Sequence, residues 1–363
     1  MLALALGLGG CLVEAEAELD AELDADGFRI VDGQLTEDWP AVVGVTSSVG
    51  LCSGTQITDR LVLTAAHCLT GFDEAGALFE ADPASVQIYW GSDLLAGLSG
   101  LPDPAFQGWR GATKIEIHPG WDYTLGLATD FALVFLDGPG YAEPIPIRTD
   151  DARVPVGTDV ELVGFGTYEV LELDGGLAPQ YDGRKRFGDA PLISLASLDP
   201  ALAPLDDELY AADGSGLAAN GCYGDSGGPL LGTHDGEDIV LGVASFVDSG
   251  VCDMTTLYSR VDVAEDFIDQ YVGISPVLEC VDELEDGTYV AHFGYMNRAP
   301  WTVAREPGSS NRFHPSSIDR GQPGAFAPGR HVDVFTVPFS GGNLVWTLGS
   351  KTATAGAGSS RCG

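Results

Sequence analysis

Short runs of β-branched and other apolar residues recur along this chain of 363 residues, and turn residues separate them. Runs of this length and spacing are typical of antiparallel strands in an all-β barrel or sandwich. The 49 glycines and 21 prolines supply turns and leave little room for long amphipathic helices. One helix is predicted over residues 263–271, where apolar residues recur at helical spacing. The predicted strands are Val42–Thr46, Val86–Trp90, Lys114–Ile117, Phe131–Leu136, Val160–Phe165, Leu192–Leu195 and Ile239–Val247.

The charge is strongly negative and unevenly distributed. The chain has 17 basic and 54 acidic residues, a net charge of −37, of which −30 falls in residues 30–275 and −1 in residues 276–363. Such a charge repels nucleic-acid phosphates, so nucleic-acid binding is excluded. The change near residue 275 predicts a domain boundary there. The one basic cluster before that boundary, Arg184-Lys185-Arg186, is predicted to head an exposed strand.

The first 29 residues have the composition of export and processing segments. Residues 1–10 form a short apolar run ending in small residues, Cys11 follows, and acids dominate residues 12–29. Two interpretations of residues 1–11 stay open: an ordinary signal peptide that contains a cysteine, or a segment that resembles the bacterial lipoprotein signal. In the second case a lipid on Cys11 would anchor the protein to a membrane. Residues 12–29 are interpreted as an acidic propeptide. No apolar run reaches the length of a membrane-spanning helix.

Three segments carry residues suited to nucleophilic catalysis. His67 ends the apolar run LVLTAAHC (61–68), Asp130 precedes another apolar run in TDFALV (129–134), and Ser226 lies in GCYGDSGGP (221–229). A serine hydroxyl needs a neighbouring base, and an imidazole titrates near neutral pH. A buried aspartate can fix the imidazole tautomer and stabilise the imidazolium. Glycines beside the serine let backbone N–H groups, here of Gly224 and Ser226, approach a developing oxyanion.

These motifs, in the order His, Asp, Ser, resemble the chymotrypsin/trypsin family of serine endopeptidases over residues 30–272. The resemblance implies an all-β fold of two antiparallel β-barrels with the active site between them. It further implies a secreted or cell-envelope enzyme that hydrolyses protein or peptide substrates and needs no cofactor or metal. The alternative function is that of a catalytically silent homologue acting as a surface-binding protein.

The resemblance also assigns cysteine pairs. A bridge beneath the histidine would join Cys52 to Cys68, and a bridge between the serine loop and the pocket wall would join Cys222 to Cys252. Outside the resemblance, Cys280 and Cys362 bracket the C-terminal segment and are predicted to staple its ends together. With seven cysteines in the chain, Cys11 is left over. Disulfides indicate an oxidising compartment.

Residues 29–33 (RIVDG) resemble the family's zymogen junction. By this resemblance an activating protease would cut after Arg29, and the new ammonium group of Ile30 would pair with the carboxylate of Asp225. The same cut would release the following residues from any lipid on Cys11.

The resemblance places Asn220, where trypsin-like enzymes have Asp, at the base of the specificity pocket. Ser245, Phe246 and Val247 match the family's substrate-binding strand, and Val247 and Thr256 fall where open pockets have glycine. This arrangement resembles that of elastases and implies cleavage after Ala, Val, Thr or Leu. A preference for a polar side chain through Asn220 is the alternative.

Residues 276–363 resemble a small β-sandwich module of exported bacterial proteins. Strands are predicted over Thr288–Phe293, Val332–Val337 and Leu344–Leu348. Arginines alternate with aromatic residues here, which favours either a face that binds a glycan or cell surface, or ordinary packing. These residues are Arg298, Arg305, Arg312, Arg320, Arg330, Tyr295, Trp301, Phe313 and Phe326.

Overall fold

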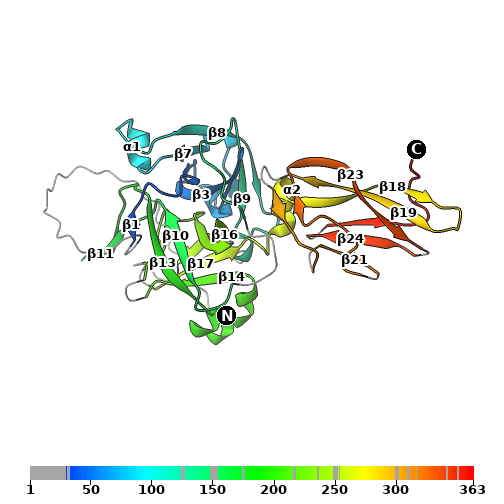
Figure 1. Ribbon diagram of the computed structural model, residues 1–363. Helices are drawn as coiled ribbons and strands as arrows, with labels where there is room; N and C mark the ends of the chain where they lie inside the picture. Colours follow the sequence, from blue (N-terminus) through cyan, green and yellow to red (C-terminus); the bar gives the residue numbers. More distant parts are fainter. Residues whose placement is uncertain are drawn as a thin grey trace.

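A computed structural model shows an all-β molecule with a few short helices (Figure 1). Its described residues are 30, 33–123, 127–147, 154–173, 176–215, 218–234, 237–247, 252, 254–298, 302–308, 311–315, 317–340, 342–349 and 351–363. Arg29 and Cys11 therefore lie outside the described residues. No helix in the described ranges is long and apolar enough to cross a membrane.

Six strands close the first barrel in the order β2-β3-β4-β9-β8-β7, with all neighbours antiparallel. Antiparallel neighbours can be joined by short loops, so strands that follow one another along the chain can pair side by side around a closed barrel. The side chains inside are mainly the β-branched and leucine residues that defined the predicted runs. The strands are β2 (Val42–Thr46), β3 (Leu51–Thr58), β4 (Leu61–Thr64), β7 (Gln87–Trp90), β8 (Gly108–Ile117) and β9 (Ala132–Leu136).

A second set of six strands runs β13-β10-β15-β16-β17-β14, and a pairing of β13 with β14 closes it into a barrel. Strand β1 (Gln34–Leu35) extends its edge at β13. The predicted fold class of two antiparallel β-barrels is thus confirmed. The strands are β10 (Asp159–Gly164), β13 (Arg186–Ile193), β14 (Leu209–Asp213), β15 (Pro229–His234), β16 (Glu237–Val247) and β17 (Thr255–Arg260).

Short elements join the barrel strands. Two of them are hairpins, formed by β5 with β6 and by β11 with β12. The others are a helix, α1, and five short 3-10 helices. Their bounds are β5 (Thr70–Phe72), β6 (Leu78–Glu80), β11 (Glu169–Leu173), β12 (Gly176–Gln180), α1 (Leu94–Ser99), η1 (Ala66–Cys68), η2 (Pro83–Ser85), η3 (Leu127–Thr129), η4 (Leu195–Ser197) and η5 (Pro200–Asp207).

After helix α2 (Glu265–Val272) the chain enters eight further strands, which we call the C-terminal strands. Two three-stranded sheets, β18-β19-β23 and β21-β24-β25, share one hydrophobic core, and β20 pairs with β22. In Figure 1 these strands lie beyond α2, on the side away from the barrels. Their bounds are β18 (Ile274–Glu283), β19 (Tyr289–Asn297), β20 (Val303–Ala304), β21 (Asn311–His314), β22 (Ala325–Phe326), β23 (Gly329–Phe339), β24 (Leu344–Leu348) and β25 (Lys351–Ala355).

Packing accounts for three of the aromatic residues noted in the C-terminal segment. Tyr295, Phe313 and Phe326 are buried in the core that the two sheets share. Arg305 is buried as well, and Arg330 forms a bidentate ion pair with Glu279. Four of these five side chains are therefore buried, and the exposed Arg330 is held by its ion pair. Trp301 lies outside the described residues.

Two local predictions are wrong. The strand predicted at Leu192–Leu195 ends at Ile193, because the hydroxyl of Ser194 caps the helix η4 that follows. The basic cluster heads β13, but it is largely buried. The ammonium of Lys185 donates to the carbonyls of Asp38 and Trp39, at 3.2 and 3.0 Å, and these bonds compensate for its burial.

Candidate active site

Neighbouring strands bring His67 and Asp130 together. Strands β4 and β9 pair from Leu61 with Phe135 to Thr64 with Ala132. His67 lies three residues beyond the end of β4, in η1, and Asp130 lies two residues before the start of β9. Because the strands are antiparallel, the end of one meets the start of the other at one rim of the barrel.

Three donors surround the carboxylate of Asp130. Its Oδ2 lies 2.7 Å from Nδ1 of His67, and its Oδ1 accepts the backbone N–H of His67 at 3.0 Å. The hydroxyl of Ser245, in β16, donates to Oδ2 at 2.6 Å. An ionised carboxylate can only accept, so Nδ1 of His67 carries the hydrogen and Nε2 is left as the basic nitrogen.

The environment of His67 favours its charged form. Burial acts to lower the pKa of the imidazole, but the negative charge of Asp130 and its hydrogen bond outweigh that effect and raise the pKa above the ordinary 6.5. Asp130 is only 1% exposed, so water screens its charge weakly. An imidazole held in this way can take up a proton during a reaction and release it again.

The Ser226 loop is fixed against the first barrel. The backbone N–H of Ser53, in β3, donates to the carbonyl of Ser226 at 2.8 Å, and the Ser53 hydroxyl donates to the carbonyl of Gly224 at 2.9 Å. Sγ of Cys68, the residue after His67, lies 3.5 Å from the same Ser226 carbonyl oxygen. The loop therefore lies beside η1, the element that carries His67.

Two left-handed backbone positions give the Ser226 loop its shape. Gly224 and Gly227 have φ values of +97° and +80°, which residues with a side chain adopt only with strain. A Cβ at Gly227 would lie 2.1 Å from Oγ1 of Thr64. Glycine at 227 therefore allows the turn after Ser226 to pack directly against β4.

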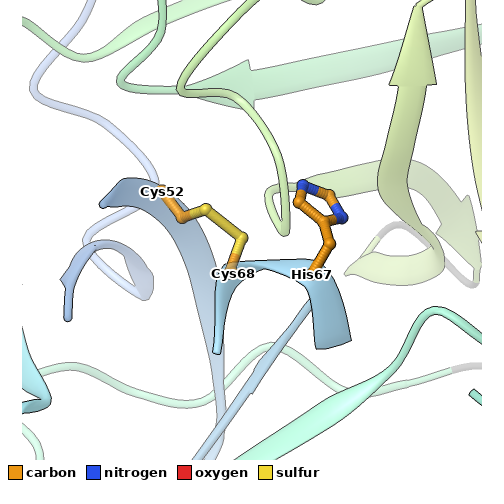
Figure 2. Close-up of side chains that lie close together, drawn as sticks. All are labelled: Cys52, His67 and Cys68. Carbon is orange, nitrogen blue, oxygen red and sulfur yellow. A yellow bond between two sulfur atoms is a disulfide. The ribbon is translucent and has the colours of Figure 1, made fainter. Parts of the chain in front are cut away.

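The structure contains the disulfides Cys52–Cys68, Cys222–Cys252 and Cys280–Cys362, the same three pairs as those expected from the sequence. Figure 2 shows the first of them beside His67, where β3 meets η1. A ring nitrogen of His67 and the two sulfurs lie within 4.8 Å of one another, but these sulfurs are bonded to each other and offer no thiolate to a metal ion.

Asp225 is buried beside the Ser226 turn. Its carboxylate accepts the backbone N–H groups of Gly166, at 2.8 Å, and Cys222, at 2.9 Å. Burial raises the pKa of Asp225 to about 6, and those two donors and the charge of Arg186 limit the rise. The side chain of Ile30 is buried in the core of the second barrel.

The pocket residues expected from the sequence lie on paired strands and on the segment before the Ser226 loop. Val247 in β16 faces Thr256 in β17. The Thr256 hydroxyl accepts the N–H of Gly221 at 2.9 Å and donates to Oδ1 of Asn220 at 2.6 Å. Among the described residues, the buried Nδ2 of Asn220 has no hydrogen-bond partner.

The other two residues expected at the pocket, Ser245 and Phe246, lie on β16 as well. The hydroxyl of Ser245 turns to Asp130, as described above, and Phe246 is exposed on β16. Sequence reasoning missed this contact of Ser245 and the two bonds by which Ser53 holds the Ser226 loop. No local sequence signal marks either contact, because 115 residues separate Ser245 from Asp130 and 171 separate Ser53 from Gly224.

Comparison with known proteins gives the family. The sequence model of the Trypsin family matches residues 30–268. Phenoloxidase-activating factor 3 of Holotrichia diomphalia is 27% identical over 273 residues, which cover 69% of this chain and 74% of that protein. Serine protease 56 of Mus musculus is 29% identical over 261 residues, covering 68% of this chain but 39% of that protein. Brachyurin of Leptuca pugilator is 27% identical over 233 residues, covering 62% and 89%. With its two β-barrels and this family match, the chain belongs to the trypsin family of serine endopeptidases.

Proposed function

We propose that the protein is an exported endopeptidase that hydrolyses peptide bonds through an acyl-enzyme on Ser226. The observation that carries the proposal is the short contact, 2.7 Å, between His67 Nδ1 and a buried Asp130 carboxylate, with the Ser226 loop packed beside it. In this mechanism Oγ of Ser226 attacks the scissile carbonyl while Nε2 of His67 takes its proton. His67 then passes that proton to the leaving amine, and water hydrolyses the acyl group by the reverse proton transfers.

The oxyanion of each tetrahedral intermediate would bind the backbone N–H groups of Gly224 and Ser226. Gly224 adopts a left-handed φ and has no Cβ, so none of its own side-chain atoms occupies that space. A catalytically silent surface-binding homologue is not favoured, because the chain retains all three reactive side chains and Gly224. Loss of one of them would have supported that alternative.

Cleavage after Arg29 is the proposed activation step. It would create an ammonium group on Ile30, whose side chain already packs in the second barrel. The buried Asp225 carboxylate has two N–H donors, and an ion pair with that ammonium would lower its pKa from about 6. This pairing would order the neighbouring Ser226 loop, and residues 12–29 would be the propeptide.

The proposed substrates are proteins and peptides cut after small or medium uncharged residues. The paired side chains of Val247 and Thr256 narrow the pocket, and Thr256 covers Asn220 through their hydrogen bond. One methylene changes discrimination in such apolar pockets only modestly, so the preference should be graded rather than absolute.

The protein is further proposed to be exported from the cytoplasm and attached to a membrane before cleavage. Three disulfides favour an oxidising compartment outside the cytoplasm. A lipid on Cys11 would hold the uncleaved form at a membrane, and cleavage after Arg29 would release the rest. Labelled palmitate should then enter the wild-type protein and not Cys11→Ala. Equal labelling of both would rule out a lipid on Cys11.

Labelling with a fluorophosphonate tests the catalytic proposal. The probe should react with the protein cleaved after Arg29 and not with Ser226→Ala, because only an activated serine displaces its leaving group. Arg29→Gln should stay uncleaved and unlabelled, while the exposed Arg60→Gln serves as the matched control and should label normally. Labelling of Ser226→Ala, or none of the cleaved wild type, would contradict the mechanism.

A further inference from the structure

Helix α2 and the C-terminal strands meet at a contact of opposite charges, which we call the junction. Lys351, at the start of β25, lies 2.9 Å from Oδ1 of Asp266, and Arg305 lies 3.9 Å from Oε1 of Glu265. The backbone N–H of Arg298 donates to the carbonyl of Gly273 at 3.1 Å. Figure 1 shows α2 between the barrels and these strands.

Burial affects two carboxylates of the junction to different extents, since Asp269 is buried whereas the side chain of Glu265 is 22% exposed. Asp269 is 3% exposed and lines a cavity of about 40 Å³ whose other walls include Ile147, Val303 and Arg305. Within the described ranges, Oε1 of Glu265 is buried and has no hydrogen-bond partner. Carboxylates that lose water without gaining donors are costly to keep ionised.

The buried charges at the junction do not balance. Glu265 and Asp269 are four residues apart on α2 and so project from the same side of the helix. In the part of the chain that the structure describes, one buried guanidinium, that of Arg305, faces them, while Asp266 and Lys351 pair at the surface. This geometry leaves an excess of one negative charge in a largely apolar contact, which binding of a proton would relieve.

We propose that the junction is proton-linked: uptake of a proton by Glu265 and Asp269 tightens the docking of the C-terminal strands on α2, and its loss loosens that docking. The chain passes from α2 into β18 through Gly273, where a Cβ would lie 2.3 Å from Cγ of Asp269. The titrating carboxyl group thus packs against the backbone at the point where the strands could swing.

The pKa values of Glu265 and Asp269 are both shifted in the direction that proton uptake on docking requires. Burial and the neighbouring charge of Asp269 raise the pKa of Glu265 to about 7, with Asp266 adding to the rise and Arg305 and Lys351 opposing it. Burial raises the pKa of Asp269 to about 6, against Arg305, Lys351 and Arg298 and with Asp266. When the C-terminal strands are not docked on α2, the pKa of both carboxyl groups would be about 4. Docking is therefore most favourable below about pH 4 and weakens as the pH rises through 6 and 7.

Hydrogen exchange on the full chain, with Ser226→Ala to prevent self-digestion, tests the proposal. Peptides covering 269–276 and 302–308 should be several-fold better protected at about pH 5 than at about pH 8, once exchange times are corrected for intrinsic rates. A peptide from β19 serves as the internal reference for global unfolding. The expected difference is confined to the junction.

Neutral isosteres identify the groups. Glu265→Gln with Asp269→Asn should give junction protection that no longer depends on pH. Glu283→Gln is the matched control, since that side chain is 50% exposed and pairs with Arg361, outside the junction, and it should keep the wild-type pH dependence. Wild-type protection independent of pH would overturn the proposal, and so would an unchanged pH dependence in the double variant. If the double variant loses β19 protection, Glu265→Gln alone must still reduce the pH dependence.

Discussion

The carboxylate of Asp130 sets the pH at which His67 can act as a base. In the proposed mechanism the reaction needs neutral His67, so the raised pKa predicts that activity is lost on acidification at a higher pH than for a free imidazole. In Asp130→Asn the low-pH limb of kcat/KM should move down, and the rate should fall by about 10⁴-fold, the known loss for this change in serine-protease triads. The exposed Asp59→Asn is the control. If the low-pH limb of kcat/KM did not move in Asp130→Asn, Asp130 would not be the group that raises the pKa of His67.

Val247 should limit the size of the side chain that enters the pocket. Val247→Gly should raise kcat/KM for peptides cut after Phe or Tyr relative to Ala, measured on a matched peptide series. A strong preference of the wild type for Arg or Lys would contradict the proposed pocket.

Thr256→Gly should destabilise the protein by about 1–3 kcal/mol, because Gly221 N–H and Asn220 would lose a buried partner.

The sequence predicts the roles of single residues that belong to motifs. It does not predict the surroundings of residues whose hydrogen-bond partners lie far away in the chain. His67, Asp130 and Ser226 stand in recognisable segments, so their types and order carry the prediction. Lys185 does not, because the carbonyls that satisfy its buried ammonium lie about 146 residues earlier in the chain. A run of three basic residues looks like a solvated surface until those acceptors are known.

The hairpin of β5 and β6, which follows η1 in the chain, exposes apolar side chains. It starts two residues after Cys68, and its exposed Phe72 and Leu78 are cross-strand partners. The ring of Phe72 packs 4.8 Å from that of Tyr123, whose pKa is raised by burial and by the charge of Asp130. Tyr123 thus contacts the hairpin and lies close enough to Asp130 to feel its charge.

Phe72→Ala should weaken binding of long peptides without altering the chemistry. We expect KM for an extended peptide to rise several-fold and kcat for a single-residue ester to stay unchanged, since the ester ends before the hairpin. Phe106→Ala, which removes a ring of similar exposure that packs on Tyr89, is the control. A loss on the ester in Phe72→Ala would instead assign the ring to the positioning of His67.

Strand existence was predictable and strand ends were less so. Val42–Thr46 and Leu344–Leu348 have the predicted bounds, because turn residues flank a clear apolar run. Strand β8 begins at Gly108, six residues before its predicted start, because its first residues pair with β7 although they show no apolar alternation. Pairing partners fix such ends, and a single run of sequence does not contain them.

Net charge should govern how substrates approach. Residues 30–275 carry a net charge of −30, so cationic peptides should be drawn in and acidic ones repelled. The value of kcat/KM for a cationic peptide should fall as salt rises, while that for a neutral peptide of the same cleavage site should hardly change. Equal salt dependence for both peptides would assign the effect to the enzyme's stability and not to the encounter.

The break in charge near residue 275 coincides with the passage from α2 to β18. Composition could indicate this change because it averages over many residues. It could not indicate the junction, since Arg305 and Glu265 are 40 residues apart and neither has an unusual sequence neighbourhood. Contacts between units depend on how the folded surfaces meet.

The Cys280–Cys362 bridge has a mechanical consequence. It joins Cys280, in the second half of β18, to Cys362, with their Cα atoms 4.9 Å apart. A pull between the barrels and Cys362 would run through residues 274–280 and then across the sulfur bond. Strands β19 to β25, which lie between the bridged cysteines in sequence, would carry almost none of that tension. A cut inside one of their loops would likewise leave both fragments attached, so the C-terminal strands should tolerate force and nicking better than their size suggests.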